Sequence, residues 1–188
     1  MEKDFKQVPS NLLKVVICGP ESTGKTTLAR QLSDYYQTTC VKEFARDYLQ
    51  KKWDQKKEVC SRADLPIIVA GQIQLENEAT TMAKQVLICD TNVVVTRVWS
   101  ETHFDGYCDP QIVACCHQFH YNYYLLTGID VPWQKDDLRD RPNDRQMIFD
   151  YFKNTLDQLG ENYAILEGNR EKRLRKAINT INKLLKKT

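Results

Sequence analysis

Five short, mostly apolar runs recur along this chain. They cover residues 13–18, 38–42, 85–90, 121–127 and 163–166. Runs of this kind, without regular alternation of polar positions, are typical of parallel strands that are covered on both faces. We therefore predict five strands in one parallel sheet.

The segments between these runs show helical spacing, in which apolar residues recur every three or four positions. Predicted helices cover 27–33, 66–84, 91–102, 109–119 and 144–159, and a last helix opens at 168–169. The strongly charged stretch 50–62 is predicted as a solvated helix and loop. Strands alternating with helices predict a doubly wound α/β fold, whose ligands bind at the carboxyl ends of the strands.

Length and composition indicate a single domain. The chain has 188 residues, 41% hydrophobic and 28% charged, which is typical of a single globular domain. We expect a flexible arm over 1–12 and one domain over 13–188. No apolar run has the length of a membrane span and no signal peptide is recognisable, so we expect no membrane partner.

Charge and cysteine content bear on the binding partners and on the cellular compartment of the protein. The net charge of +2 gives no indication of a nucleic-acid partner, and the basic residues of 170–187 are expected on the solvated face of a packed helix. The seven cysteines include no C-x-x-C pair, which indicates free thiols in a reducing cytoplasm. The sequence does not indicate an oligomeric state.

The first strand leads into a glycine-rich loop that carries the strongest chemical signal. The loop matches G-x-x-x-x-G-K-[ST], the phosphate-binding loop, and it lies between a strand and a helix, where backbone N–H groups can point at a phosphate. The alternative is a chance glycine turn. We predict that the phosphates of ATP are bound by Gly19, Glu21, Ser22, Thr23, Gly24, Lys25, Thr26 and Thr27.

Acidic and polar residues follow the third strand. Asp90 closes this strand, at the position of the acid that helps to hold Mg²⁺ in phosphate-loop enzymes. We predict that Thr26 and Asp90 hold Mg²⁺, which prefers oxygen ligands. The alternative is that Asp90 caps the next helix. Asn92 is a candidate substrate-binding residue.

Glu43 and Arg46 follow the second strand. Transfer of a phosphoryl group to an alcohol needs a group that accepts the hydroxyl proton. Glu43 is predicted to be this base, with Arg46 beside the acceptor and Lys25 at the phosphates. The alternative is a surface ion pair of little energetic consequence.

The polar segment 129–143, called the lid below, precedes a predicted helix. It contains Trp133, Arg139 and Arg141. Arginines that close over phosphates neutralise developing charge and exclude water. We predict a catalytic role for Arg139 and a nucleotide contact for Arg141. The alternative is a solvated charged loop.

These motifs together resemble the ribosylnicotinamide kinase domain of NadR-type proteins. The resemblance rests on GPESTGKTT at 19–27, the block 43–46, the strand end at 89–91, and Pro132-Trp133 with Asp136 and Arg139. It covers about residues 13–185. It implies a three-layer phosphate-loop kinase fold with strand order 2-3-1-4-5, and a kinase domain without the adenylyltransferase domain that such proteins usually carry.

The resemblance also implies a reaction, in which ATP phosphorylates the ribose 5′-hydroxyl of nicotinamide riboside to give nicotinamide mononucleotide. Trp133 would stack on the nicotinamide ring, and Gly168 and Asn169 would lie by the adenine. Two alternatives stay open: a kinase for another nucleoside or nucleotide, and a regulatory nucleotide-binding module. The acid Glu43 and the arginine-rich lid favour a kinase.

Overall fold

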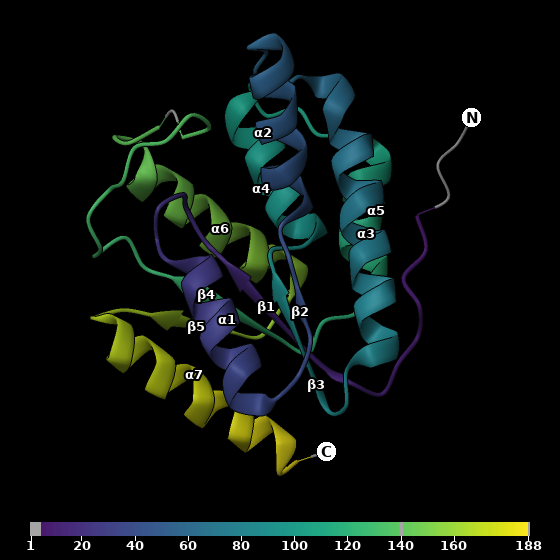
Figure 1. The fold of residues 1–188 in the computed structure, drawn as a ribbon, viewed down its shortest axis with the longest axis vertical. Coiled ribbons are helices and arrows are strands. Elements are labelled where there is room, and N and C mark those ends of the chain that lie inside the picture. The colour runs from purple at the N-terminus through teal and green to yellow at the C-terminus, as the bar shows by residue number, and fades with distance from the viewer. Residues whose placement is uncertain (1–4, 140, 188) are drawn as a thin grey trace.

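The computed structural model describes residues 5–139 and 141–187. Its centre is a five-stranded sheet in the order β2-β3-β1-β4-β5, in which every pairing is parallel (Figure 1). The predicted strand order and sheet type are therefore confirmed. The strands are β1 Leu13–Cys18, β2 Cys40–Val41, β3 Val86–Asp90, β4 Tyr123–Thr127 and β5 Tyr163–Leu166.

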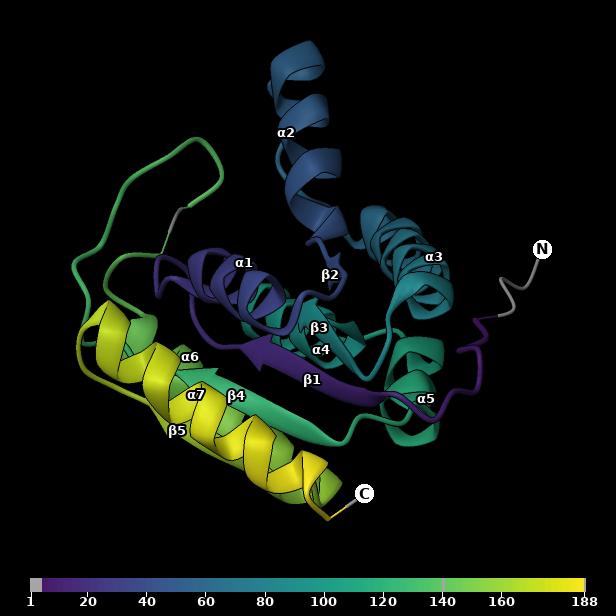
Figure 2. The same ribbon diagram turned by 60° about the horizontal axis from the view of Figure 1, so that its bottom comes forward.

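Helices cover both faces of this sheet. On one face, α1 and α7 pack against the side chains of Val15 and Ile17, and Figure 2 shows α7 in front of β4 and β5. On the other face, α3 to α6 pack against Val16 and Cys18. Successive strand side chains point to opposite faces, so the apolar run of β1 supplies both cores. These helices are α1 Lys25–Tyr36, α3 Leu65–Met82, α4 Val93–His103, α5 Pro110–Gln118, α6 Arg145–Leu159 and α7 Arg170–Leu185.

Helix α2, Phe44–Lys56, stands away from the sheet. None of its residues is buried, which agrees with the charged sequence of this region. It is followed by a short 3-10 helix, Arg62–Asp64. Because α2 begins directly after the edge strand β2, its first turn lies beside the carboxyl ends of the strands.

Element boundaries differ from the sequence-based expectation at two functional places. Helix α1 begins at Lys25, inside the glycine-rich motif, because Gly24 takes a left-handed conformation (φ +84°) at its N-cap. Strand β2 has two residues rather than five and pairs only with β3. An edge strand has hydrogen-bond partners on one side only, so it can end early.

The described part of the predicted N-terminal arm, residues 5–12, contains no helix or strand. The Gln7 amide donates to Glu76 Oε1 (2.7 Å), and the backbone N–H of Val8 donates to Asn77 Oδ1 (2.8 Å). These contacts attach residues 7 and 8 to α3; residues 1–4 lie outside the described part of the chain. Within the described ranges, no helix combines the length and apolar character needed to cross a membrane.

Candidate active site

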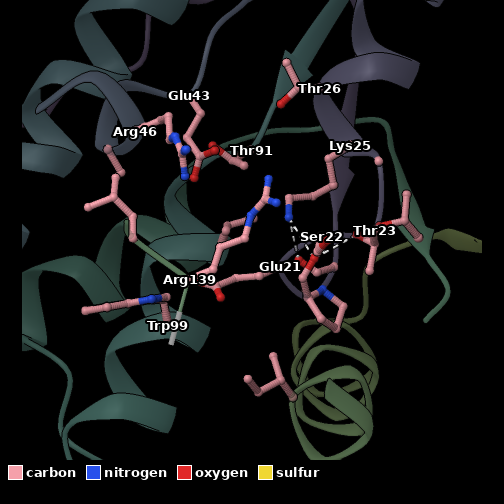
Figure 3. A pocket seen from close by; sticks show the side chains of 18 of the residues that line it. Glu21, Ser22, Thr23, Lys25, Thr26, Glu43, Arg46, Thr91, Trp99 and Arg139 are labelled. Carbon is pink, nitrogen blue, oxygen red and sulfur yellow. Dashed lines mark hydrogen bonds between the residues drawn. The ribbon is translucent and has the colours of Figure 1, made fainter. Parts of the chain in front are cut away.

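One cavity of about 910 Å³ lies at the carboxyl ends of the strands. Its walls come from the loop after β1, from helices α1 to α4, from the lid, from α6 and from the start of α7. Figure 3 shows Lys25 and Glu21 on one side of this space, Glu43 and Arg46 on a second, and Trp99 on a third. Segments that are far apart in the sequence therefore meet around one volume.

The glycine-rich loop is fixed by contacts with β4. Gly19 has φ +133°, and a Cβ there would lie 2.5 Å from Thr127 Oγ1, so only glycine permits this approach. The Thr127 hydroxyl donates to the Cys18 carbonyl (3.0 Å) and pairs with the Thr23 hydroxyl (2.7 Å). The loop thus keeps its shape through buried hydrogen bonds that do not involve its free N–H groups.

The start of α1 has the properties of an anion site. Gly24 provides no side-chain cap for the first turn, so the N–H groups there are available to a ligand, at the positive end of the helix dipole. The Lys25 ammonium donates to the carbonyls of Gly19 (3.0 Å) and Pro20 (2.9 Å). The predicted phosphate-binding residues that line the cavity are Gly19, Glu21, Ser22, Thr23, Gly24, Lys25, Thr26 and Thr27.

Asp90 and Thr26 meet at the edge of this loop. The Thr26 hydroxyl hydrogen-bonds the Asp90 carboxylate, and burial is the largest cause of a raised pKa of Asp90. Asp90 is 2% exposed, and its Oδ1 has no hydrogen-bond partner among the described residues. A buried carboxylate oxygen without a donor suits a hard cation. Since the described residues contain no group of three or more His, Cys, Asp or Glu that could hold a metal, phosphate oxygens and waters would have to complete its coordination.

Glu43 lies at the N-cap of α2 and lines the cavity. Burial raises the pKa of this carboxyl above its ordinary value of 4.5; Lys25 opposes the rise and Asp90 adds to it. A carboxylate with a raised pKa is a stronger base than an exposed one. The predicted base therefore stands within electrostatic range of the predicted phosphate lysine.

Gln72 is a buried residue of α3 that sequence reasoning missed. Its Oε1 accepts a hydrogen bond from Phe44 N (2.9 Å), and its Nε2 donates to Lys42 O (3.2 Å). The neighbouring Gly71 leaves room for the Phe44 ring, which lies 2.3 Å from where a Cβ would be. The backbone is therefore held on both sides of Glu43. No sequence signal marks Gln72, because a glutamine in an apolar helix face has no motif.

The lid lies over the cavity and is joined to α2 by an ion-pair chain. Arg46 binds Asp136 through two hydrogen bonds (3.1 and 2.9 Å), and Arg139 Nε lies 3.0 Å from the same carboxylate. The N–H of Gln134 donates to Ser22 Oγ (2.8 Å), which joins the lid to the phosphate loop. Arg46, Arg139 and Arg141 all line the cavity, and Figure 3 shows Arg139 reaching between Lys25 and Trp99. Residue 140 of the predicted lid lies outside the described ranges.

The side chains of two predicted substrate contacts, Trp133 and Asn92, contact other parts of the fold. Trp133 is not among the residues that line the cavity; its ring lies 5.9 Å from the Arg145 guanidinium, because the lid turns this side chain toward α6. Asn92 is 1% exposed. Its side chain accepts from Val94 N and Val95 N and caps α4, so its amide oxygen is already engaged within the fold.

The predicted adenine residues, Gly168 and Asn169, precede Arg170, which lines the cavity. Asn169 caps α7 by accepting from Lys172 N, and neither Gly168 nor Asn169 lines the cavity. Arg173, expected on the solvated face of the last helix, is instead 5% exposed. It donates to the carbonyls of Gly168 (2.9 Å), Thr23 (2.7 Å) and Gly128 (3.0 Å). Arg173 thus ties the loop after β5 to the phosphate loop and to the loop after β4.

The apolar part of the cavity wall was also missed. Its side chains are largely apolar and come from α3, from α4 and from the residue after α4. They include Leu65, Ile68, Val95, Trp99 and Phe104. The sequence places these residues on amphipathic helices, but it does not distinguish a packed core face from the wall of a cavity.

Comparisons with known proteins identify the family and the fold of this chain. A family model described as an AAA domain matches residues 14–173. The trifunctional NAD biosynthesis/regulator proteins NadR of Salmonella typhimurium and Escherichia coli are each 29% identical to this chain over 125 residues, or 66% of it. The chain spans 30% of the length of these curated relatives.

Solved structures show the same fold. A NadR protein in complex with NR superposes with a TM-score of 0.76 at 19% identity, over 92% of this chain and 50% of that one. Thymidylate kinase from Ehrlichia chaffeensis superposes with a TM-score of 0.63 at 12% identity, over 94% of this chain and 100% of that one. The fold is therefore that of phosphate-loop kinases.

Proposed function

This chain belongs to the AAA domain family, and from that premise we propose that it is an ATP-dependent kinase that phosphorylates the 5′-hydroxyl of nicotinamide riboside. The observation that carries the proposal is that one cavity has a phosphate loop on one side and a carboxylate with a raised pKa, Glu43, on another. The choice of acceptor is supported by the NadR relatives, which are named as NAD biosynthesis proteins.

At the phosphate end, the loop 19–27 is proposed to bind the triphosphate. The first-turn N–H groups of α1 and the Lys25 ammonium supply the positive charge, since Lys25 can exchange its two loop carbonyls for phosphate oxygens. Gly168, Asn169 and Arg141 are proposed to lie by the rest of the nucleotide. Arg173 supports this part of the site by holding Thr23 and Gly168 in place.

Thr26 and Asp90 are the residues that would hold Mg²⁺. When bound, the ion would neutralise the charge of the phosphates. The hydrogen bond of Thr26 to Asp90 and the unpartnered Asp90 Oδ1 support this assignment. Burial is the main cause of the raised pKa of Asp90, and a bound cation would oppose this rise by favouring the ionised carboxylate.

At the acceptor end, Glu43 is proposed to accept the proton of the 5′-hydroxyl. Its pKa is raised by burial, while Lys25, Arg46 and Arg139 favour the ionised form. Arg46 is proposed to contact the acceptor or the transferred phosphoryl group. Arg139 would stabilise the charge that develops in transfer, since positioned cations act strongly in a site that excludes water. The lid supplies that exclusion.

The product would be nicotinamide mononucleotide, an intermediate of NAD salvage. We also propose a cytoplasmic location, because all seven cysteines are free thiols in the structure, as expected in a reducing compartment.

The test is acceptor-dependent ADP release from ATP and Mg²⁺, with mass detection of the product, across a panel of nucleosides that includes nicotinamide riboside. We expect saturable turnover with nicotinamide riboside and none in Lys25→Ala, with the far-ultraviolet circular dichroism of that variant unchanged. Turnover with another nucleoside only would retain the kinase and change its substrate. Tight nucleotide binding without any acceptor-dependent turnover would overturn the kinase in favour of a regulatory module.

A further inference from the structure

The aromatic wall of the cavity is a binding surface that the proposed reaction leaves unassigned. We propose that Trp99, on α4, is the residue on which the planar base of the acceptor nucleoside stacks. The inference rests on the proposed kinase function and adds to it the class of group that the distal end of the site takes: a flat aromatic ring, including a positively charged one.

The position of Trp99 along α4 suits this role. Thr91 lines the cavity beside Glu43, and Val95 and Trp99 line it on the following turns of the helix. A helix rises about 1.5 Å per residue, so Trp99 lies roughly 9 Å along α4 from its first residue, Val93. A nucleoside whose 5′-hydroxyl lies at Glu43 would extend its base in this direction.

The indole of Trp99 is held in a fixed orientation by its neighbours. The His103 imidazole stacks against it with ring centroids 4.2 Å apart at 16°, and Phe104 meets it edge-on at 5.6 Å and 82°. These two contacts fix the orientation of the indole, and Trp99 lines the cavity, where Figure 3 shows its side chain. A rigid surface loses little conformational entropy when a ligand stacks on it.

Trp99 is the sole tryptophan among the described residues that line the cavity, since Trp53 and Trp133 do not. The walls around it are apolar, with Leu65, Ile68 and Phe104. Such walls favour a ring over a solvated polar group, and an indole face attracts a cationic ring through its quadrupole. The nicotinamide of the proposed substrate has both properties.

The kinetic test measures KM for nicotinamide riboside and for ATP by ADP release. Stacking of a base on an aromatic side chain is worth about 1–3 kcal/mol. We therefore expect Trp99→Leu to raise the acceptor KM about 5- to 150-fold with little change in the ATP KM, and Trp99→Phe to recover most of the loss. The matched control is Trp53→Leu, on α2 and outside the cavity. An unchanged acceptor KM in Trp99→Leu, or a rise only in Trp133→Leu, would overturn the inference.

A binding measurement keeps the inference falsifiable if Trp99→Leu folds poorly. The chain has three tryptophans, so Trp53→Phe with Trp133→Phe leaves Trp99 as the sole tryptophan, which can be excited selectively over tyrosine. We expect saturable quenching of its fluorescence by nicotinamide riboside, or by whichever nucleoside the wild type phosphorylates. Turnover without quenching would refute the stacking role alone. If the wild type phosphorylates no nucleoside, the proposed kinase function is wrong, and the inference that rests on it is wrong as well.

Discussion

Replacing Gln72 by leucine would remove the two hydrogen bonds that hold the backbone on either side of Glu43. Leucine keeps the apolar packing of α3 but cannot accept from Phe44 N or donate to Lys42 O. We expect two effects: a moderate loss of stability, and a larger loss of catalysis because the loop that carries the proposed base is no longer fixed.

The magnitudes follow from the geometry. Each bond is partly buried, and a hydrogen bond contributes about 0.5–1.5 kcal/mol net, so the pair contributes roughly 1–3 kcal/mol. For a domain of this size that lowers Tm by roughly 2 to 12 °C. A displacement of about 1 Å at a catalytic group can cost roughly 100-fold in rate, so we expect kcat to fall about 10- to 100-fold.

The assay compares kcat, both KM values and urea unfolding for Gln72→Leu and for Gln74→Leu. Gln74 is a suitable control because it is exposed on the same helix, and its amide donates to the nearby Glu78 (2.9 Å). The pH dependence of kcat separates a positioning role from an effect on stability alone. In the wild type, kcat should fall at low pH as Glu43 becomes protonated (the acid limb), and this fall should be smaller in Gln72→Leu. Loss of stability with unchanged kcat and an unchanged acid limb would refute the positioning role.

Two further predictions concern the carboxylates of Glu43 and Glu76. We expect Glu43→Gln to abolish most turnover and to stabilise the fold, because burial raises the pKa of Glu43 and its ionisation therefore costs folding energy. The gain in stability over the wild type should be absent below the ordinary pKa, grow as the pH rises through the raised pKa, and then stay constant. Urea midpoints of the variant that do not change with pH relative to wild type would contradict this. In the cluster at the opposite edge of the sheet, Lys14 donates to Glu76 Oε1 (2.9 Å) and Tyr121 to Glu76 Oε2 (2.7 Å). Glu76→Leu should lower the free energy of unfolding, measured in urea, by about 3–5 kcal/mol, because it leaves the Lys14 ammonium buried without its partner. Adding Lys14→Met should recover part of this loss. A double variant no more stable than Glu76→Leu would argue against an electrostatic origin.

Local patterns were sufficient to predict the fold and the position of the glycine-rich loop beside the cavity. The apolar run Leu13–Cys18 and the motif that follows it predict a buried strand, a loop and a helix start, because each depends on neighbouring residues alone. Asp90 and Glu43 were predicted as site residues for the same reason: both follow strands, and the carboxyl ends of parallel strands meet at one edge of the sheet.

The acceptor end was decided by tertiary structure. Trp133 and Trp99 are chemically identical, and only the path of the lid and the packing of α4 determine that Trp99 lines the cavity. Gln72 and Arg173 depend on backbone partners in distant segments of the chain, such as Lys42 and Thr23. A hydrogen bond joins two groups whatever their separation in sequence, and a side chain faces a cavity only once the neighbouring elements have packed. The sequence by itself therefore determined the sheet and the phosphate loop, whereas the tertiary structure alone decided which side chains hold the base in place and which aromatic surface lines the acceptor end.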